Sequence, residues 1–213
     1  MTAILSEATR LRDLIVRVGR SIFDRGLTPG STGNISVRLS DGTLLMTPTN
    51  ASLGALEPDR LALTDADGAH ISGDKPTKEA FLHSCMYCER AVDNAVVHLH
   101  STHAVAVSVL ADRDPADVLP PLTAYYVMRV GQLPLIPYFA PGDRDLALAV
   151  KAAAGSHHAV LLANHGPVVS GATLQDAQYA TEELEETARL YLLLGDRPVR
   201  PLTEAQVAQL RHR

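Results

Sequence analysis

The sequence predicts an α/β fold in which a central, largely antiparallel sheet lies between layers of helices. Three observations favour this architecture. Short apolar, β-branched runs typical of strands occur beside longer stretches whose apolar residues recur at helical spacing. Asp-Gly turns at Asp41-Gly42 and Asp67-Gly68 favour antiparallel hairpins. The predicted strands and helices do not follow the strict βαβ alternation of a parallel sheet.

The elements of the first half follow from periodicity and turn residues. Apolar residues recur at helical spacing from Ala8 to Ile22, and Gly26 follows as a stop. Alternating residues and short apolar runs predict strands at 35–39, 43–46, near 61–64 and at 94–99, with a helix at 79–90 before the last of these.

In the second half, a helix is predicted at 103–110, and Pro120, Pro121 and Pro134 frame an irregular region with a short strand at 133–136. Thr173 and Asp176 resemble a capping box that starts a long helix ending at Gly195. The acidic run in that helix, 182–186, is interpreted as a solvated face. The remaining predictions are helices at 143–154 and 203–210 and strands at 159–163 and 167–170.

Length and composition limit the function classes. A chain of 213 residues without a linker-like stretch predicts one domain over residues 1–213. The formal net charge of −5 argues against a nucleic-acid groove built from positive charge. The first residues lack a basic segment followed by a long apolar one, and no membrane span is evident, so we expect a cytoplasmic protein without a membrane partner.

Three histidines form the most informative pattern. His98 and His100 are two residues apart at the end of a predicted strand, so their side chains project from the same face. His165, in Asn164-His165-Gly166, follows a second apolar run. Single histidines at strand ends are usually structural, but two at this spacing and a third after another strand favour a metal site. Three protein ligands and one open position are typical of a catalytic metal.

Glu79 is the nearest candidate carboxylate, because it opens the helix predicted at 79–90. From position alone, a glutamate in a first turn is more often a helix starter than a catalytic group. Beside three ligating histidines, however, it could serve as a fourth ligand that substrate displaces and then as a general acid or base.

Two loops could bind phosphate. Thr32-Gly33-Asn34 and Thr47-Pro48-Thr49-Asn50 combine hydroxyl groups with turn residues that expose backbone N–H groups. Each pattern alone also occurs in ordinary turns. The sequence contains no Walker A motif, no GxGxxG after a strand and no GxSxG elbow, so nucleotide hydrolysis, nicotinamide chemistry and α/β-hydrolase chemistry have no support.

Taken together, five stretches resemble the class II aldolase/adducin family, and the resemblance spans nearly the whole chain. They are residues 31–34, 47–49, 77–79, 95–100 and 163–166. Four further stretches, 72–79, 98–102, 127–131 and 182–188, are most similar to the members that decarboxylate 3-oxo-tetronate 4-phosphates. The resemblance implies a three-layer α/β/α fold.

The resemblance also implies the residues of the site. A Zn²⁺ ion, or another divalent cation such as Mn²⁺ or Co²⁺, would be held by three histidines and a glutamate that also transfers protons. A homotetramer is implied, with sites between subunits and Tyr125 serving the neighbouring site. The metal ligands would be Glu79, His98, His100 and His165, and the phosphate pocket Gly33, Asn34, Thr49, Thr77 and Lys78.

The implied reaction is decarboxylation of a phosphorylated four-carbon sugar acid, a 3-oxo-tetronate 4-phosphate, to dihydroxyacetone phosphate and carbon dioxide. A divalent ion would stabilise the enediolate that remains when carbon dioxide leaves. Glu79 or Tyr125 would then manage the proton delivered to C2.

Two alternatives remain open. A sugar-phosphate aldolase of the L-fuculose-phosphate type, or a pentulose-phosphate 4-epimerase, belongs to the same family. Lys78, however, stands where such aldolases usually have Ser, and Asn50 stands where they often have Gly or Ser. Both departures make the aldolase's own substrate less well supported for this chain. The other alternative is a non-catalytic, adducin-like binding module, but such a module should have lost metal ligands that this chain retains.

Overall fold

The computed structural model describes residues 2–140 and 143–211, and the strands in this part of the chain form one eight-stranded sheet. The sheet order is β4-β3-β2-β1-β5-β8-β7-β6, and its neighbouring strands are antiparallel except for the parallel pair β6 and β7. The strands are β1 (Asn34–Arg38), β2 (Leu44–Met46), β3 (Ala62–Thr64), β4 (His70–Ser72), β5 (Ala95–His98), β6 (Leu135–Ile136), β7 (Ala159–Leu162) and β8 (Gly166–Gly171).

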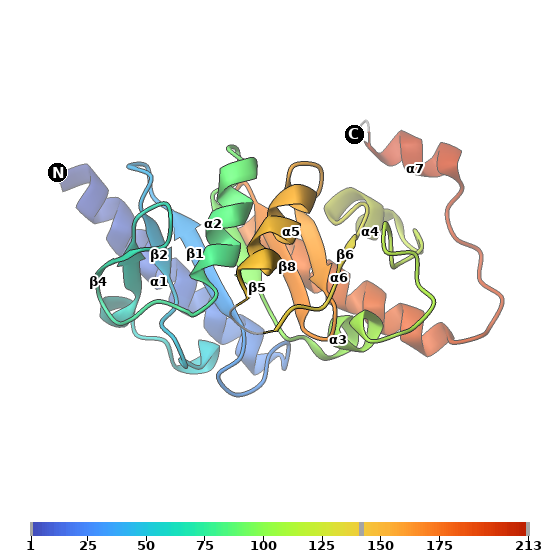
Figure 1. The fold of residues 1–213 in the computed structure, drawn as a ribbon, viewed down its shortest axis with the longest axis horizontal. Coiled ribbons are helices and arrows are strands. Elements are labelled where there is room, and N and C mark those ends of the chain that lie inside the picture. Colours follow the sequence, from blue (N-terminus) through green and yellow to red (C-terminus); the bar gives the residue numbers. More distant parts are fainter. Residues whose placement is uncertain (1, 141–142, 212–213) are drawn as a thin grey trace.

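Helices cover both faces of the sheet, as Figure 1 shows. On one face, α2 and α5 pack side by side, and on the other lie α1, α3, α4 and α6. The helices are α1 (Thr2–Asp24), α2 (Ala80–Glu89), α3 (Thr102–Ser108), α4 (Ala124–Arg129), α5 (Arg144–Ala154), α6 (Leu174–Leu194) and α7 (Glu204–Arg211), with short 3₁₀ helices η1 (Leu53–Ala55) and η2 (Pro58–Arg60). The predicted three-layer α/β/α fold is therefore confirmed.

Successive side chains of β5 point to opposite faces of the sheet and so enter two different hydrophobic clusters. Val96 packs in the cluster beneath α2 and α5, whereas Ala95 and Val97 pack in the cluster beneath α1. His98 therefore lies on the same face as Val96, toward α2. The register of this central strand thus decides which helix approaches the histidine.

One α-helix, α4, was not predicted from the sequence. The region between Pro121 and Pro134, expected to be irregular before its short strand, contains α4. The Thr123 side chain accepts a hydrogen bond from the Tyr126 N–H at 3.0 Å and so caps this helix. The helix is only six residues long and rich in aromatic and β-branched residues, which have weak helix propensity. Its stability comes from packing, since Tyr126 is fully buried.

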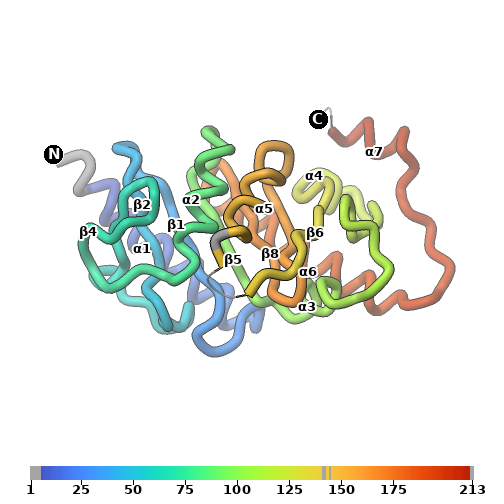
Figure 2. Tube along the Cα trace, viewed as in Figure 1, coloured from blue at the N-terminus to red at the C-terminus, as the bar shows by residue number. Residues whose placement is uncertain are grey.

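The last described helix, α7, is joined to α6 by an extended segment. After α6 the chain follows this extended path to α7, which lies beside α4 (Figure 2). The Leu202 N–H donates to the Pro121 carbonyl at 2.9 Å and holds this path against the body. Within the described residues, no helix has the length and apolar character needed to cross a membrane.

The acidic run of α6 is not the solvated face that its charge predicts. Glu185 is buried, with 7% of its surface exposed, and Leu184 is fully buried. The Glu185 carboxylate accepts hydrogen bonds from the backbone N–H groups of His103 and Ala104, both at 2.9 Å. It thereby satisfies two N–H groups at the start of α3, where helix polarity favours an anion. Glu186, in contrast, is exposed and pairs with Arg189 at the surface.

Replacing Glu185 with alanine should destabilise the protein. Glu185→Ala leaves one buried and one partly buried N–H group without an acceptor, and we expect the free energy of unfolding to fall by about 1–3 kcal/mol. Glu186→Ala removes only an exposed ion pair and should change it by less than about 0.5 kcal/mol. Urea unfolding at one fixed protein concentration measures both. Equal losses in the two variants would contradict the capping role.

Candidate metal centre

Two chain segments meet at one end of the sheet. β5 ends at His98, and His100 follows just beyond the strand rather than within it. The turn between β7 and β8 contains His165, and Gly166, which begins β8, has φ +151°. A Cβ atom at Gly166 would lie 2.2 Å from the Leu99 carbonyl oxygen. Only glycine therefore lets the turn approach β5 closely enough to bring His165 beside the other two histidines.

The three imidazoles converge as predicted. The Nε2 atoms of His98 and His165 are 3.3 Å apart, those of His98 and His100 are 3.2 Å apart, and those of His100 and His165 are 3.1 Å apart. The rings meet edge to face, with centroids 4.6–5.0 Å apart. Three nitrogen atoms thus surround one point from three directions.

These spacings fit a divalent cation. Nitrogen ligands about 2.0–2.1 Å from a tetrahedral zinc ion lie roughly 3.3 Å from one another. His98 Nδ1 lies 2.8 Å from the Pro167 carbonyl oxygen, which can only accept a hydrogen bond. A neutral His98 therefore carries its proton on Nδ1 and presents the Nε2 lone pair to the cluster.

Glu79 completes the group. It is the N-cap residue of α2, but its side chain makes no capping hydrogen bond, which argues against a role as mere helix starter. Its Oε1 lies 3.1 Å from His165 Nε2, and its Oε2 lies 3.4 Å from His98 Nε2. The ligand atoms of the four residues all lie within 4.8 Å of one another, so they could hold a metal ion together.

The pKa values of the cluster residues are shifted in the directions that favour binding of a cation. Burial lowers the pKa of His98, and burial together with the neighbouring rings lowers that of His100 to about 4. Burial acts to raise the pKa of Glu79, but His98, His165 and Asn34 outweigh it and hold that pKa well below its usual range. The lowered pKa values favour the neutral form of His98 and His100 and the ionised form of Glu79.

The cluster opens into a cavity of about 680 Å³. Its wall includes three of the metal-cluster residues, Glu79, His100 and His165. Each residue predicted for the phosphate pocket also lines it, namely Gly33, Asn34, Thr49, Thr77 and Lys78. The lining also includes aromatic and apolar residues that were not predicted from the sequence, namely Phe81, Tyr138, Phe139 and Leu146.

Asn34 has a contact that the sequence did not suggest. Its Nδ2 donates to Glu79 Oε2 at 2.7 Å, and its Oδ1 contacts His83 Nε2 at 2.5 Å. Sequence patterns did not single out His83, which is fully buried. The spacing of Glu79 and His83, one helical turn apart, was the signal that could have linked them.

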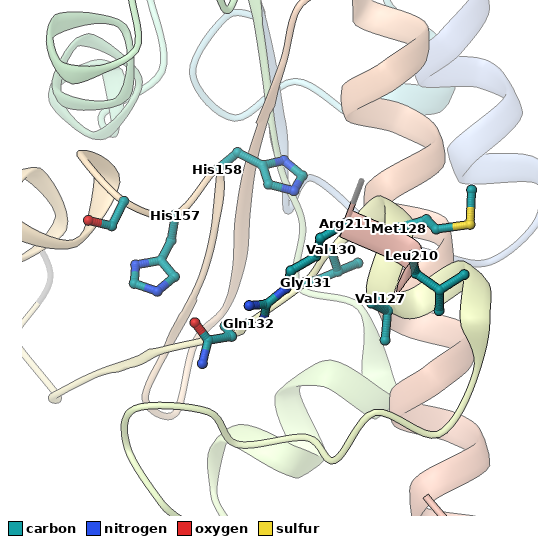
Figure 3. Close-up of a pocket in the computed structure, with 10 residues that line it drawn as sticks. Val127, Met128, Val130, Gly131, Gln132, His157, His158, Leu210 and Arg211 are labelled. Carbon is teal, nitrogen blue, oxygen red and sulfur yellow. The ribbon is translucent and has the colours of Figure 1, made fainter. Parts of the chain in front are cut away.

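Tyr125 lies away from this cavity. It is 62% exposed on α4 and lines a separate hollow with Arg129 and residues of α6. Figure 3 shows another cavity of about 490 Å³, bounded by the end of α4, by His157 and His158, and by Arg211 of α7. Neither hollow is lined by a residue of the metal cluster. Within one chain, Tyr125 is therefore not part of the candidate centre.

The sequence model of the class II aldolase and adducin N-terminal domain matches residues 13–192. A 3-oxo-tetronate 4-phosphate decarboxylase of Escherichia coli (strain K12) is 50% identical over 201 residues, which cover 94% of this chain and 95% of that protein. An L-fuculose phosphate aldolase of the same strain is 35% identical over 206 residues, covering 95% of this chain and 93% of the aldolase.

Solved structures agree with the sequence comparison. The crystal structure of YgbL from Escherichia coli superposes with a TM-score of 0.94 at 48% sequence identity. The match covers 96% of this chain and 99% of YgbL. With a family match over most of its length and a converged His and Glu cluster, the chain belongs to the class II aldolase and adducin family.

Proposed function

We propose that this protein is a carboxy-lyase that converts a 3-oxo-tetronate 4-phosphate to dihydroxyacetone phosphate and carbon dioxide. The observation that carries the proposal is the converged cluster of His98, His100, His165 and Glu79 at the cavity. A chain that is 50% identical to a decarboxylase of this substrate and retains such a cluster is best explained as an enzyme.

Class II aldolases depend on divalent metal ions, and the donor set of three imidazoles and one carboxylate suits zinc best. When bound, the ion supplies a Lewis acid beside the substrate's ketone oxygen, where negative charge develops as carbon dioxide leaves. Mn²⁺ and Co²⁺ have compatible ligand preferences and are the alternatives.

Glu79 would carry the proton. When the bond between C1 and C2 breaks, its electron pair moves toward the ketone oxygen, and C2 must later receive one proton to give the product. The carboxylate is ionised at neutral pH and lies on the cavity wall, so it can accept a proton and deliver it to C2. The Asn34 amide holds Oε2 and leaves Oε1 facing His165.

The phosphate would bind at the side of the cavity formed by two loops and the start of α2. Thr49 and Thr77 contribute hydroxyl groups there, Gly33 allows close backbone approach, and Lys78 contributes a cation on the exposed rim. Lys78 could neutralise either the phosphate or the departing carboxylate. Asn34 would add its second amide hydrogen, since only one is used by Glu79.

We further propose a homotetramer with its sites between subunits. Tyr125 is too remote to reach the cluster of its own chain, and its exposure on α4 leaves it available to a neighbouring copy. In that arrangement its hydroxyl would supply the alternative proton donor to C2.

Product analysis separates this function from an aldolase. With the metal-loaded protein and a 3-oxo-tetronate 4-phosphate, we expect carbon dioxide and dihydroxyacetone phosphate in equal amounts. Removing the metal with a chelator should abolish turnover, and adding back Zn²⁺, Mn²⁺ or Co²⁺ should restore it. Aldehyde release from L-fuculose 1-phosphate with a higher kcat/KM would identify the protein as an aldolase instead.

Glu79→Gln should retain the fold and lose turnover. The amide keeps the shape of the side chain but cannot carry the proton, so kcat should fall by about 10²–10⁴-fold. Glu89→Gln, at the other end of α2 and beside Lys151, is the matched control and should leave kcat within about twofold. Steady-state kinetics with metal analysis measures both effects. Wild-type turnover in Glu79→Gln would exclude the proton-transfer role.

The lowered histidine pKa values predict how metal affinity depends on pH. Protons compete with the metal for imidazole only near and below each ring's pKa. Because the pKa of His98 is lowered and that of His100 is lowered to about 4, protons compete less with the metal for these two rings at pH 6 than they do for an exposed imidazole. Competition with a chelator of known pH dependence should show affinity falling by less than about tenfold from pH 8 to pH 6. A larger fall would mean that these rings protonate at their ordinary pKa.

A further inference from the structure

A buried row of polar side chains lies behind Glu79. On α2, Glu79, His83 and Tyr87 are spaced four residues apart and share one side of the helix. On β1, Asn34 and Ser36 are two residues apart and share the face toward α2. The helix side and the strand face meet, so a line of hydrogen bonds runs from Glu79 into the core.

The contacts along this line are continuous. Asn34 Nδ2 donates to Glu79 Oε2 at 2.7 Å, and Asn34 Oδ1 contacts His83 Nε2 at 2.5 Å. His83 Nδ1 lies 2.7 Å from Ser36 Oγ, which lies 2.8 Å from the Tyr87 hydroxyl. His83 and Ser36 are fully buried, and Asn34 and Tyr87 are 5% exposed, so water does not replace these partners.

The carboxylate sets the direction of every hydrogen bond in the row. Glu79 can only accept, so the Asn34 amide must turn its nitrogen toward Glu79 and its oxygen toward His83. That oxygen also only accepts, so His83 must donate from Nε2. Burial lowers the pKa of His83 to about 3, so the ring is neutral and its Nδ1 can only accept. Ser36 therefore donates to Nδ1 and accepts from Tyr87.

The His83 N–H thus locks the Asn34 amide in one of its two orientations. In the flipped orientation the amide oxygen would face the Glu79 carboxylate at the 2.7 Å separation now held by the N–H, and the two oxygens would repel. The same flip would point the amide nitrogen at the His83 N–H, placing two donors against each other. Both penalties fall in a buried site, where unpaired polar groups are most costly.

We propose that His83 is a positioning residue that, through Asn34, keeps the Glu79 carboxylate aimed at the metal-binding imidazoles. His83 does not line the substrate cavity, so its effect would pass entirely through Asn34. The consequence for turnover rests on the proposed proton-transfer role of Glu79. The orientation of the Asn34 amide, and its effect on the position of the Glu79 carboxylate, do not depend on that proton-transfer role.

Three variants test the proposal by kinetics and metal affinity. His83→Phe keeps a ring of similar size but removes the N–H, and we expect kcat or metal affinity to fall about 10–100-fold, as for other partners of ligand residues. KM should change by less than about threefold. His83→Gln restores an N–H donor and should recover most of the loss. Tyr87→Phe removes a buried hydroxyl at the far end of the row but spares the contacts of His83 with Asn34, and should lower stability alone.

The tautomer of His83 tests the proposal without any assay of activity. In metal-free wild-type protein labelled with ¹⁵N-histidine, long-range ¹H–¹⁵N NMR should show His83 protonated on Nε2, with its signals assigned by their loss in His83→Gln. An Nδ1-protonated ring would overturn the proposal, as would a folded His83→Phe with wild-type kcat and metal affinity. If His83→Phe does not fold, the proposal is tested by the tautomer of His83 in the wild-type protein and by the kcat and metal affinity of His83→Gln.

These outcomes separate this proposal from the proposed reaction. A wild-type protein that binds metal but releases no carbon dioxide would refute the decarboxylase function alone. The tautomer and the metal affinity of the variants would still report on His83. Conversely, an active wild-type enzyme with His83 in the Nδ1-protonated form would refute only the positioning role.

Discussion

The pairing of β5 with its two neighbours is the constraint on which the candidate centre depends. β5 lies between β1 and β8 in the middle of the sheet, and its register places His98 opposite Asn34 on one side and Val168 on the other. The segment that enters β1 and the turn that enters β8 therefore meet at the same end of the sheet. A shift of one residue would move His98 to the other face and separate it from His165 and α2.

Desolvation then decides the charges that gather there. Burial favours the neutral form of His98 and His100 beside an ionised Glu79, so the cluster has acceptor capacity that no group of the protein satisfies. Such a group is costly to bury unless a cation satisfies it. The unfolded chain does not bring these residues together, so a bound divalent ion would also favour the folded state. Asn34, itself held by His83, orders the carboxylate through Oε2.

Local sequence patterns could predict those parts of the structure that depend on neighbouring residues. The apolar runs before His98 and before His165 and the capping box of α6 are all of this kind. What escaped prediction depends on tertiary packing. Helix α4 is too short to show a period, Glu185 is identified as a cap only once α3 lies against α6, and His83 gains its partner only through the register of β1. The role proposed for Tyr125 would likewise require a neighbouring subunit, which patterns within one chain do not reveal.

The division of the cavity suggests how one family accommodates two bond cleavages. Decarboxylation and aldol cleavage both leave an electron pair on the carbon beside a ketone, so the metal cluster can serve either reaction. The two substrates differ in the group that leaves: carbon dioxide is small and apolar, whereas an aldehyde carries hydroxyls that need partners. In this chain the lining of the cavity includes the apolar side chains of Phe81, Phe139 and Leu146. These side chains offer no hydrogen bond to the hydroxyl group of an aldehyde product, but they exclude water from a carboxylate whose charge must move to the ketone oxygen, which favours loss of carbon dioxide. The side chains that line the cavity beside the cluster would therefore determine which reaction is catalysed. The sheet and α2 would keep the geometry of the cluster the same for both reactions.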